Sequence, residues 1–88
     1  MRNQLKNEQT DIHWQWLSEQ IQFIRTYSGI EKALTIDSEL IRDVHIDSLE
    51  MLELIAAIEQ YTEQPIHDAV WMKWHNLRDI VEYLLSVK

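Results

Sequence analysis

The sequence predicts an all-α fold, a small bundle of four helices. Its 88 residues suffice for one domain. One glycine and one proline leave few of the turns that sheets and hairpins need. Apolar residues recur at helical spacing in three long segments. We therefore expect three main helices, a short third helix in chain order, and a long first loop.

The polar residues 1–9 predict a flexible leader, followed by a single domain over residues 10–88. Thr10 or Asp11 is a suitable N-cap for a first helix that runs to about Tyr27, with Gly29 just beyond its end. At about 100° per residue the apolar side chains of this helix cover a broad arc, which we expect to be buried. The arc consists of Ile12, Trp14, Trp16, Leu17, Ile21, Phe23, Ile24 and Tyr27.

A long connection over residues 30–46 leads to the second helix. Asp47 is a good N-cap, and Glu50 three residues later completes a capping-box pattern. The helix should run to Tyr61, before the break at Pro65. Its core arc is predicted to be Met51, Leu54, Ile55, Ile58 and Tyr61.

A second apolar strip of that helix, formed by Leu49, Leu52 and Ala56, has two interpretations. It lies next to Ser48 and either docks onto partner proteins or borders the site where a carried group rests, or else it packs under the first loop.

The last part of the chain predicts a short helix at about residues 66–72 and a final helix capped by Asn76, with Asp79 three residues on. The buried stripe of the final helix is Leu77, Ile80, Val81 and Leu84. Trp71 and Trp74 precede it, and they either fill the core or line a pocket or partner contact.

Charge and composition exclude several functions. The formal net charge of −7 disfavours nucleic acid and anionic membrane surfaces as partners and favours basic protein surfaces. The chain has no cysteine, and its four histidines lack metal-ligand spacing, so no metal site is expected. Lack of cysteine fits the cytoplasm. No apolar run approaches the roughly 20 residues that cross a bilayer, so no membrane insertion is expected.

Ser48 is expected at the first position of the second helix, where side chains are normally exposed. The start of a helix carries partial positive charge and unused backbone amides. A phosphate group on Ser48 would therefore be favourably placed.

The segment from Leu40 to Glu59 resembles the modification site and second helix of acyl carrier proteins, and the resemblance extends over residues 36–84. It implies that Asp47-Ser48-Leu49 is the motif whose serine carries 4′-phosphopantetheine, transferred from coenzyme A by a phosphopantetheinyl transferase. It also implies a carrier without catalytic activity, and a bundle of the acyl-carrier-protein type. Acidic residues on the second helix would meet loading and transfer enzymes that have basic docking patches. The residues predicted for these contacts are Glu50, Leu52, Glu53, Ala56 and Glu59.

Three functions stay open at this point. The first is a stand-alone, monomeric carrier of acyl groups for fatty-acid, polyketide or other specialised biosynthesis. The second is an aminoacyl or peptidyl carrier, because the region from Trp74 onward faintly resembles the D-alanyl carrier protein. The third is a small helical adaptor with no prosthetic group.

The chain departs from the family pattern at His45, where the family usually has glycine. Glycine there permits a left-handed backbone. Histidine is one of the non-glycine residues that tolerate positive φ, so the question is whether the same turn forms.

Overall fold

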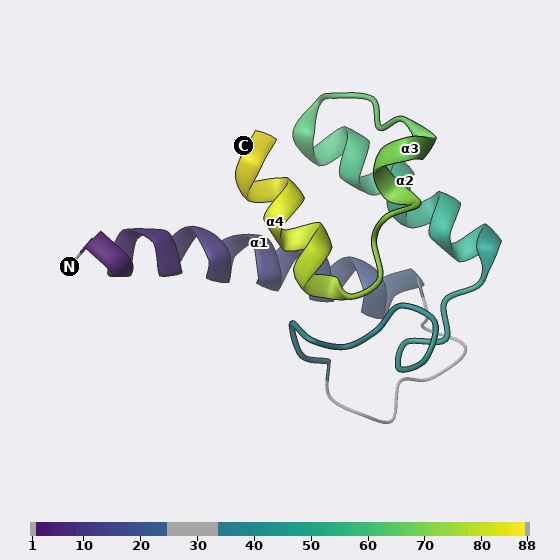
Figure 1. Ribbon diagram of the computed structural model, residues 1–88, viewed down its shortest axis with the longest axis horizontal. Coiled ribbons are helices and arrows are strands. Elements are labelled where there is room, and N and C mark those ends of the chain that lie inside the picture. The colour runs from purple at the N-terminus through teal and green to yellow at the C-terminus, as the bar shows by residue number, and fades with distance from the viewer. Residues whose placement is uncertain (1, 25–33, 88) are drawn as a thin grey trace.

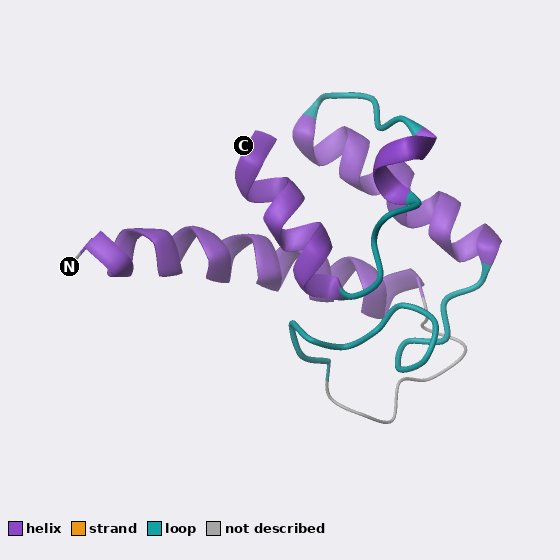
Figure 2. Cartoon of the chain, viewed as in Figure 1, coloured by secondary structure: helices purple, strands orange, loops and turns teal. Residues whose placement is uncertain are grey.

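The computed structural model describes residues 2–24 and 34–87. Within them the chain forms α1 (Arg2–Ile24), α2 (Ser48–Thr62), α3 (Asp68–Trp71) and α4 (Leu77–Val87) (Figure 1). Across these described ranges there is no β-strand (Figure 2). An isolated antiparallel bridge joins Glu39 and Asn76. The predicted fold class is confirmed. None of the helices in this part of the chain is long and apolar enough to span a membrane.

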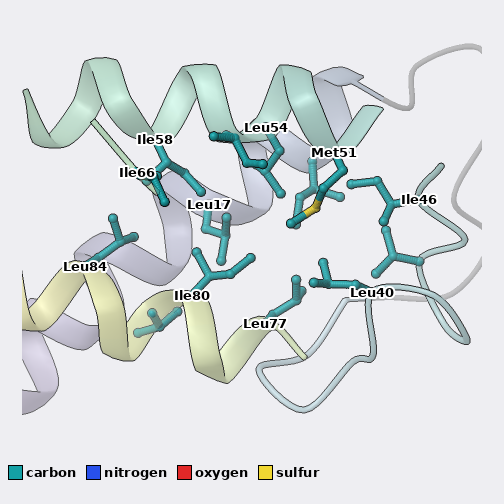
Figure 3. Packing of buried hydrophobic residues seen from close by; sticks show 14 residues of the cluster. Leu17, Leu40, Ile46, Met51, Leu54, Ile58, Ile66, Leu77, Ile80 and Leu84 are labelled. Carbon is teal, nitrogen blue, oxygen red and sulfur yellow. The ribbon is translucent and has the colours of Figure 1, made fainter. Parts of the chain in front are cut away.

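The hydrophobic core lies between α2 and α4, and α1 packs against both of these helices. Figure 3 shows side chains of α2 and α4 pointing toward one another, with Leu17 of α1 among them. Leu40 and Ile46 of the long loop close the end of this core near the start of α2.

Helix α1 differs from the prediction in its start. It begins at Arg2, so a start at Thr10 or Asp11 is wrong, and residues 2–9 form its first turns. These turns extend beyond the other helices (Figure 1). The division into a leader and a domain over residues 10–88 stays a prediction. The expected end of the helix at Tyr27 and Gly29 lies outside the described residues.

The buried face of α1 is also narrower than predicted. Leu17 and Ile21 are fully buried, whereas Ile12 is 60% exposed and Phe23 is 79% exposed. The reason is that α1 lies on the surface of α2 and α4, so only a single stripe is fully buried. Trp14, Trp16 and Ile24 are half-buried and pack against the core at its edge. His13 takes the place one turn before Leu17 on this stripe, which the apolar pattern did not reveal.

An aromatic contact joins α1 to the end of α2. The Tyr61 hydroxyl lies 2.9 Å from Nδ1 of the buried His13, and the ring of Trp16 stacks on Tyr61 with centroids 4.0 Å apart. A buried polar group is tolerated only when it is hydrogen-bonded. The hydrogen bond to Tyr61 therefore offsets the cost of burying His13, and together with the stacked Trp16 it joins α1 to α2.

Helix α2 buries Met51, Leu54, Ile55 and Ile58. Their spacing of three and four residues confirms the predicted core arc, and Tyr61 is half-buried. The helix ends at Thr62, one residue after the predicted Tyr61, because Glu63 has a left-handed backbone with φ of 58°.

The last two helices follow the prediction with small shifts. Helix α3 spans only Asp68–Trp71, not residues 66–72. The predicted cap of α4 is confirmed, since the N–H of Asp79 donates to Oδ1 of Asn76 over 3.0 Å. The N–H groups of His75 and Asn76 donate in return to Oδ2 of Asp79.

Backbone hydrogen bonds fix the long loop to the segment before α4. The N–H of Leu40 donates to the carbonyl of His75 over 2.9 Å, and the N–H of Leu77 donates to the carbonyl of Ser38 over 3.0 Å. The Arg78 guanidinium also donates to Oδ1 of Asp37, and this hydrogen bond raises the pKa of Arg78. The loop is thereby held in place beside the start of α2.

Candidate functional site

The start of α2 is built by a complete capping box. The N–H of Glu50 donates to Oδ1 of Asp47 over 2.8 Å, and the N–H of Asp47 donates to Oε1 of Glu50 over 3.0 Å. This arrangement confirms the predicted cap. It places Ser48 at the first residue of α2 with its side chain exposed to solvent.

Two backbone N–H groups remain available at this helix start. Asp47 satisfies the N–H groups of Glu50 and Met51, through its side chain and its carbonyl respectively. Those of Ser48 and Leu49 have no hydrogen-bond partner in the described part of the chain. Unused amides at the positive end of a helix favour an anion. The residues therefore fit a phosphodiester on the Ser48 hydroxyl.

The turn before Ser48 forms with histidine in place of glycine. His45 has a φ of 59°, in the left-handed region. The adjacent Val44 and Ile46 are buried, and the N–H of Ile46 donates to the carbonyl of Leu40 over 3.0 Å. These anchors hold His45 in a conformation that glycine adopts at lower cost.

An apolar groove of about 540 Å³ opens beside Ser48. Three parts of the chain form it, namely the end of the long loop, the first turns of α2, and the segment of α3 and the residues after it. Its lining residues are Leu40, Ile41, Ile46, Asp47, Ser48, Met51, Leu52, Trp71, Met72, Trp74 and His75. The size falls within the range of small-molecule sites.

Both interpretations of the tryptophans hold in the structure. Trp71 and Trp74 are half-buried, pack against the core, and line the groove at the same time. Sequence reasoning singled out the two residues but missed the groove itself, because its walls come from two separate segments of the chain, residues 40–52 and 71–75.

The outer face of α2 is open to solvent. Leu49 is 68% exposed and Leu52 is 58% exposed, and Ala56 and Glu53 on the same face are exposed as well. The interpretation that this strip packs under the first loop is therefore wrong. The strip begins directly after Ser48 and follows the helix away from it.

The acidic residues of α2 fall into two groups. Glu50 belongs to the capping box, and the half-buried Glu59 accepts a hydrogen bond from the N–H of Ile66 over 2.7 Å at Oε2. Glu53, in contrast, makes no hydrogen bond or ion pair with any described residue. Glu50 and Glu59 thus have structural roles, and Glu53 has no such role among the described residues. Contact of these three carboxylates with a partner protein stays a prediction.

The surroundings of the site are strongly acidic. From Asp37 to Asp68 the chain has nine acidic residues and one basic residue, Arg42. In the described part of the chain no group of three or more histidine, aspartate or glutamate side chains is arranged to hold a metal ion.

Comparison with known proteins links this geometry to one family. Residues 21–84 match the family described as "Phosphopantetheine attachment site". An acyl carrier protein of Phytoplasma mali is 33% identical over 64 residues, which cover 72% of this chain and 76% of that protein. An acyl carrier protein of Campylobacter jejuni is 36% identical, covering 64% and 73% respectively. One of Clostridium perfringens is 37% identical, covering 61% and 71%.

Proposed function

This chain belongs to the acyl carrier protein family, and from that premise we propose that it holds an apolar acyl group as a thioester on a 4′-phosphopantetheine arm attached to Ser48. Family membership makes the chain a carrier without enzymatic activity, with covalent 4′-phosphopantetheine as its cofactor. It likewise implies a phosphopantetheinyl transferase and acyl-transfer enzymes as partners. The attachment residue and the cargo are the substance of the proposal.

The observation that carries the proposal is the position of Ser48. Its side chain is exposed at the first residue of α2, beside two unused backbone amides and at the edge of an apolar groove. In the transfer reaction the Ser48 hydroxyl oxygen forms a bond to the phosphorus that carries the pantetheine. The pyrophosphate bond of coenzyme A breaks, 3′,5′-ADP leaves, and the hydroxyl proton is released. Asp47 keeps the helix start in place for this attack. When bound, the arm supplies a terminal thiol, which forms the thioester.

The chemistry of the groove supports an acyl cargo. Its walls are aliphatic, aromatic and thioether side chains, with Asp47, Ser48 and His75 as the polar lining residues. An acyl chain gains free energy there by leaving water. An α-ammonium group would lose hydration against the same walls, which is costly.

One observation favours the second candidate, an aminoacyl carrier. The indole rings of Trp71 and Trp74 line the groove, and an indole face attracts a cation. Mass spectrometry of the protein isolated from its source distinguishes the two candidates, because it identifies the arm and the cargo together.

Partner docking is proposed for the exposed face of α2, with Glu53 as the carboxylate that has no hydrogen bond or ion pair to any described residue. Leu49, Leu52 and Ala56 supply apolar contact, and the acidic surroundings attract a basic patch. Such charge complementarity mainly raises the association rate and selects partners. A carrier that serves several enzymes needs fast arrival and fast release. The monomeric state, the cytoplasmic location and a fatty-acid, polyketide or other specialised pathway stay predictions from the sequence.

The attachment site is tested by intact mass after incubation with coenzyme A, Mg²⁺ and a broad-specificity transferase. The unchanged protein should gain the mass of one phosphopantetheine, and Ser48→Ala should gain none while its helical content persists. Ser86→Ala is the matched control, because Ser86 is also exposed on a helix and should leave the gain intact. A protein that no competent transferase modifies, or a Ser48→Ala variant that still gains the arm, would overturn the proposal.

A further inference from the structure

A side-chain hydrogen bond holds one wall of the groove. The indole Nε1–H of Trp71 donates to Oδ1 of Asp68 over 3.0 Å. Both residues belong to the single turn α3, and Trp71 lines the groove beside Ser48 while Asp68 is exposed. The bond therefore joins a solvent-exposed carboxylate to a residue of the groove wall.

The other contacts of α3 are its backbone hydrogen bonds and the packing of the half-buried Val70 and Trp71 against the core. The helix has no side-chain N-cap hydrogen bond, and none of its residues is fully buried. Elements with few buried contacts open at low free-energy cost. Packing against the core limits where the Trp71 ring can lie, and the hydrogen bond from its N–H group to the Asp68 carboxylate adds a directional restraint on the indole.

We propose that Trp71 is a cargo-contacting residue and that Asp68 is the positioning residue that keeps its indole closed over the groove. The pair then sets how well an apolar acyl group on the arm is shielded from water. This inference rests on the function proposed above and assigns two residues to it.

The physical argument concerns the freedom of the indole. A tryptophan side chain has two rotatable bonds, and a hydrogen bond to an ionised acceptor is shorter and stronger than one between neutral groups. Fixing the indole N–H thus favours one orientation of a large, flat apolar surface. An acyl chain against that surface excludes water from the thioester at its end. Without the bond the indole populates other orientations, and the wall opens.

The experiment uses the holo-carrier loaded by a transferase from octanoyl-coenzyme A or, separately, from acetyl-coenzyme A. Hydroxylamine cleaves the thioester, giving the acyl hydroxamate and the free thiol of the arm, and intact mass gives the rate. In the unchanged protein the octanoyl thioester should be cleaved more slowly than the acetyl thioester, which is too short to fill the groove. The ratio of the octanoyl rate to the acetyl rate is compared between variants. The intrinsic difference between the two thioesters is the same in every variant, so a change in this ratio measures a change in shielding.

Four variants separate the roles of the two residues. Asp68→Ala removes the acceptor and should raise the octanoyl rate by about threefold, a factor typical of one hydrogen bond, with the acetyl rate unchanged. Asp68→Asn keeps an acceptor and should restore most of the shielding. Trp71→Phe keeps an aromatic ring but loses the N–H, so it should resemble Asp68→Ala. Trp71→Ala removes the wall and should give the largest effect.

The indole N–H signal of Trp71 in an NMR spectrum gives an independent readout. It should shift in Asp68→Ala and move only slightly in Asp68→Asn, while the melting temperature of both variants stays close to that of the unchanged protein. If the loaded carrier forms but Asp68→Ala and Trp71→Ala leave the octanoyl-to-acetyl ratio unchanged, this inference is wrong and the carrier function stands. If no arm can be attached to Ser48, the carrier proposal itself fails.

Discussion

Replacing Asp47 by alanine should destabilise the fold through the first turn of α2. The substitution removes the acceptor of the hydrogen bond from the Glu50 N–H, which measures 2.8 Å. Loss of such an N-cap typically costs about 1 kcal/mol. It also removes a negative charge from the positive end of the helix, which adds roughly 0.3–1 kcal/mol. We therefore expect the free energy of unfolding to fall by roughly 1–2 kcal/mol.

Asp47→Asn is the matched control, because asparagine caps as well as aspartate but carries no charge. Its free energy of unfolding should fall only by the smaller, electrostatic contribution of roughly 0.3–1 kcal/mol. Urea denaturation followed by circular dichroism gives both values, and the slope of the transition should stay unchanged. In thermal melts each kcal/mol should lower the midpoint by about 4–8 °C for a domain of this size. An Asp47→Ala variant as stable as the unchanged protein, or an Asp47→Asn variant that loses as much as Asp47→Ala, would refute the reasoning.

Two further predictions concern docking and the turn before Ser48. Glu53→Lys should slow acyl transfer to a partner with a basic patch by several fold at low salt without changing the melting temperature. The control Glu63→Lys, an exposed charge reversal just past the end of α2, should have a much smaller effect, and equal slowing by both would contradict local docking. His45→Val should cost about 1–2 kcal/mol, because a β-branched residue fits poorly at the observed φ of 59°. His45→Gly should be neutral or slightly stabilising in the same melts, and a valine variant of unchanged stability would show that this φ is not required.

Features that depend on local sequence could be predicted well. The capping box of Asp47 and Glu50 and the cap of α4 at Asn76 each involve residues three positions apart. Their hydrogen bonds are set by the helix start itself and need no knowledge of the rest of the fold. The exposed position of Ser48 follows from the same local geometry.

Features that depend on which elements pack together could not be predicted. Ile12 and Phe23 lie within an apolar arc but are exposed, because α1 buries fully only its stripe of His13, Leu17 and Ile21, with Trp14, Trp16 and Ile24 half-buried at the edge of the core. Periodicity gives the face of a helix but not the width of the surface that covers it. The predicted start of α1 was wrong because Thr10 and Asp11, although suitable N-cap residues, lie inside a helix that begins at Arg2.

The candidate site shows the same division. The position of Ser48 came from sequence reasoning, whereas the groove beside it came only with the structure. No pattern in the sequence indicates that Ile41 and Trp71, which are far apart in the chain, line one cavity. The structural role of Glu59 was likewise hidden, because its hydrogen-bond partner, the N–H of Ile66, lies across a turn whose geometry the sequence did not specify.

Glu53 and Glu59 differ in how freely they can be replaced when such a carrier acquires new partner enzymes over evolution. A substitution at Glu59 removes the acceptor that the Ile66 N–H requires, so a new partner preference acquired there comes with a weaker fold. Glu53 has no such obligation within the described chain and is free to vary. Redirecting this protein to a foreign synthase should therefore begin at residue 53 and the neighbouring exposed leucines, where specificity can drift without loss of stability.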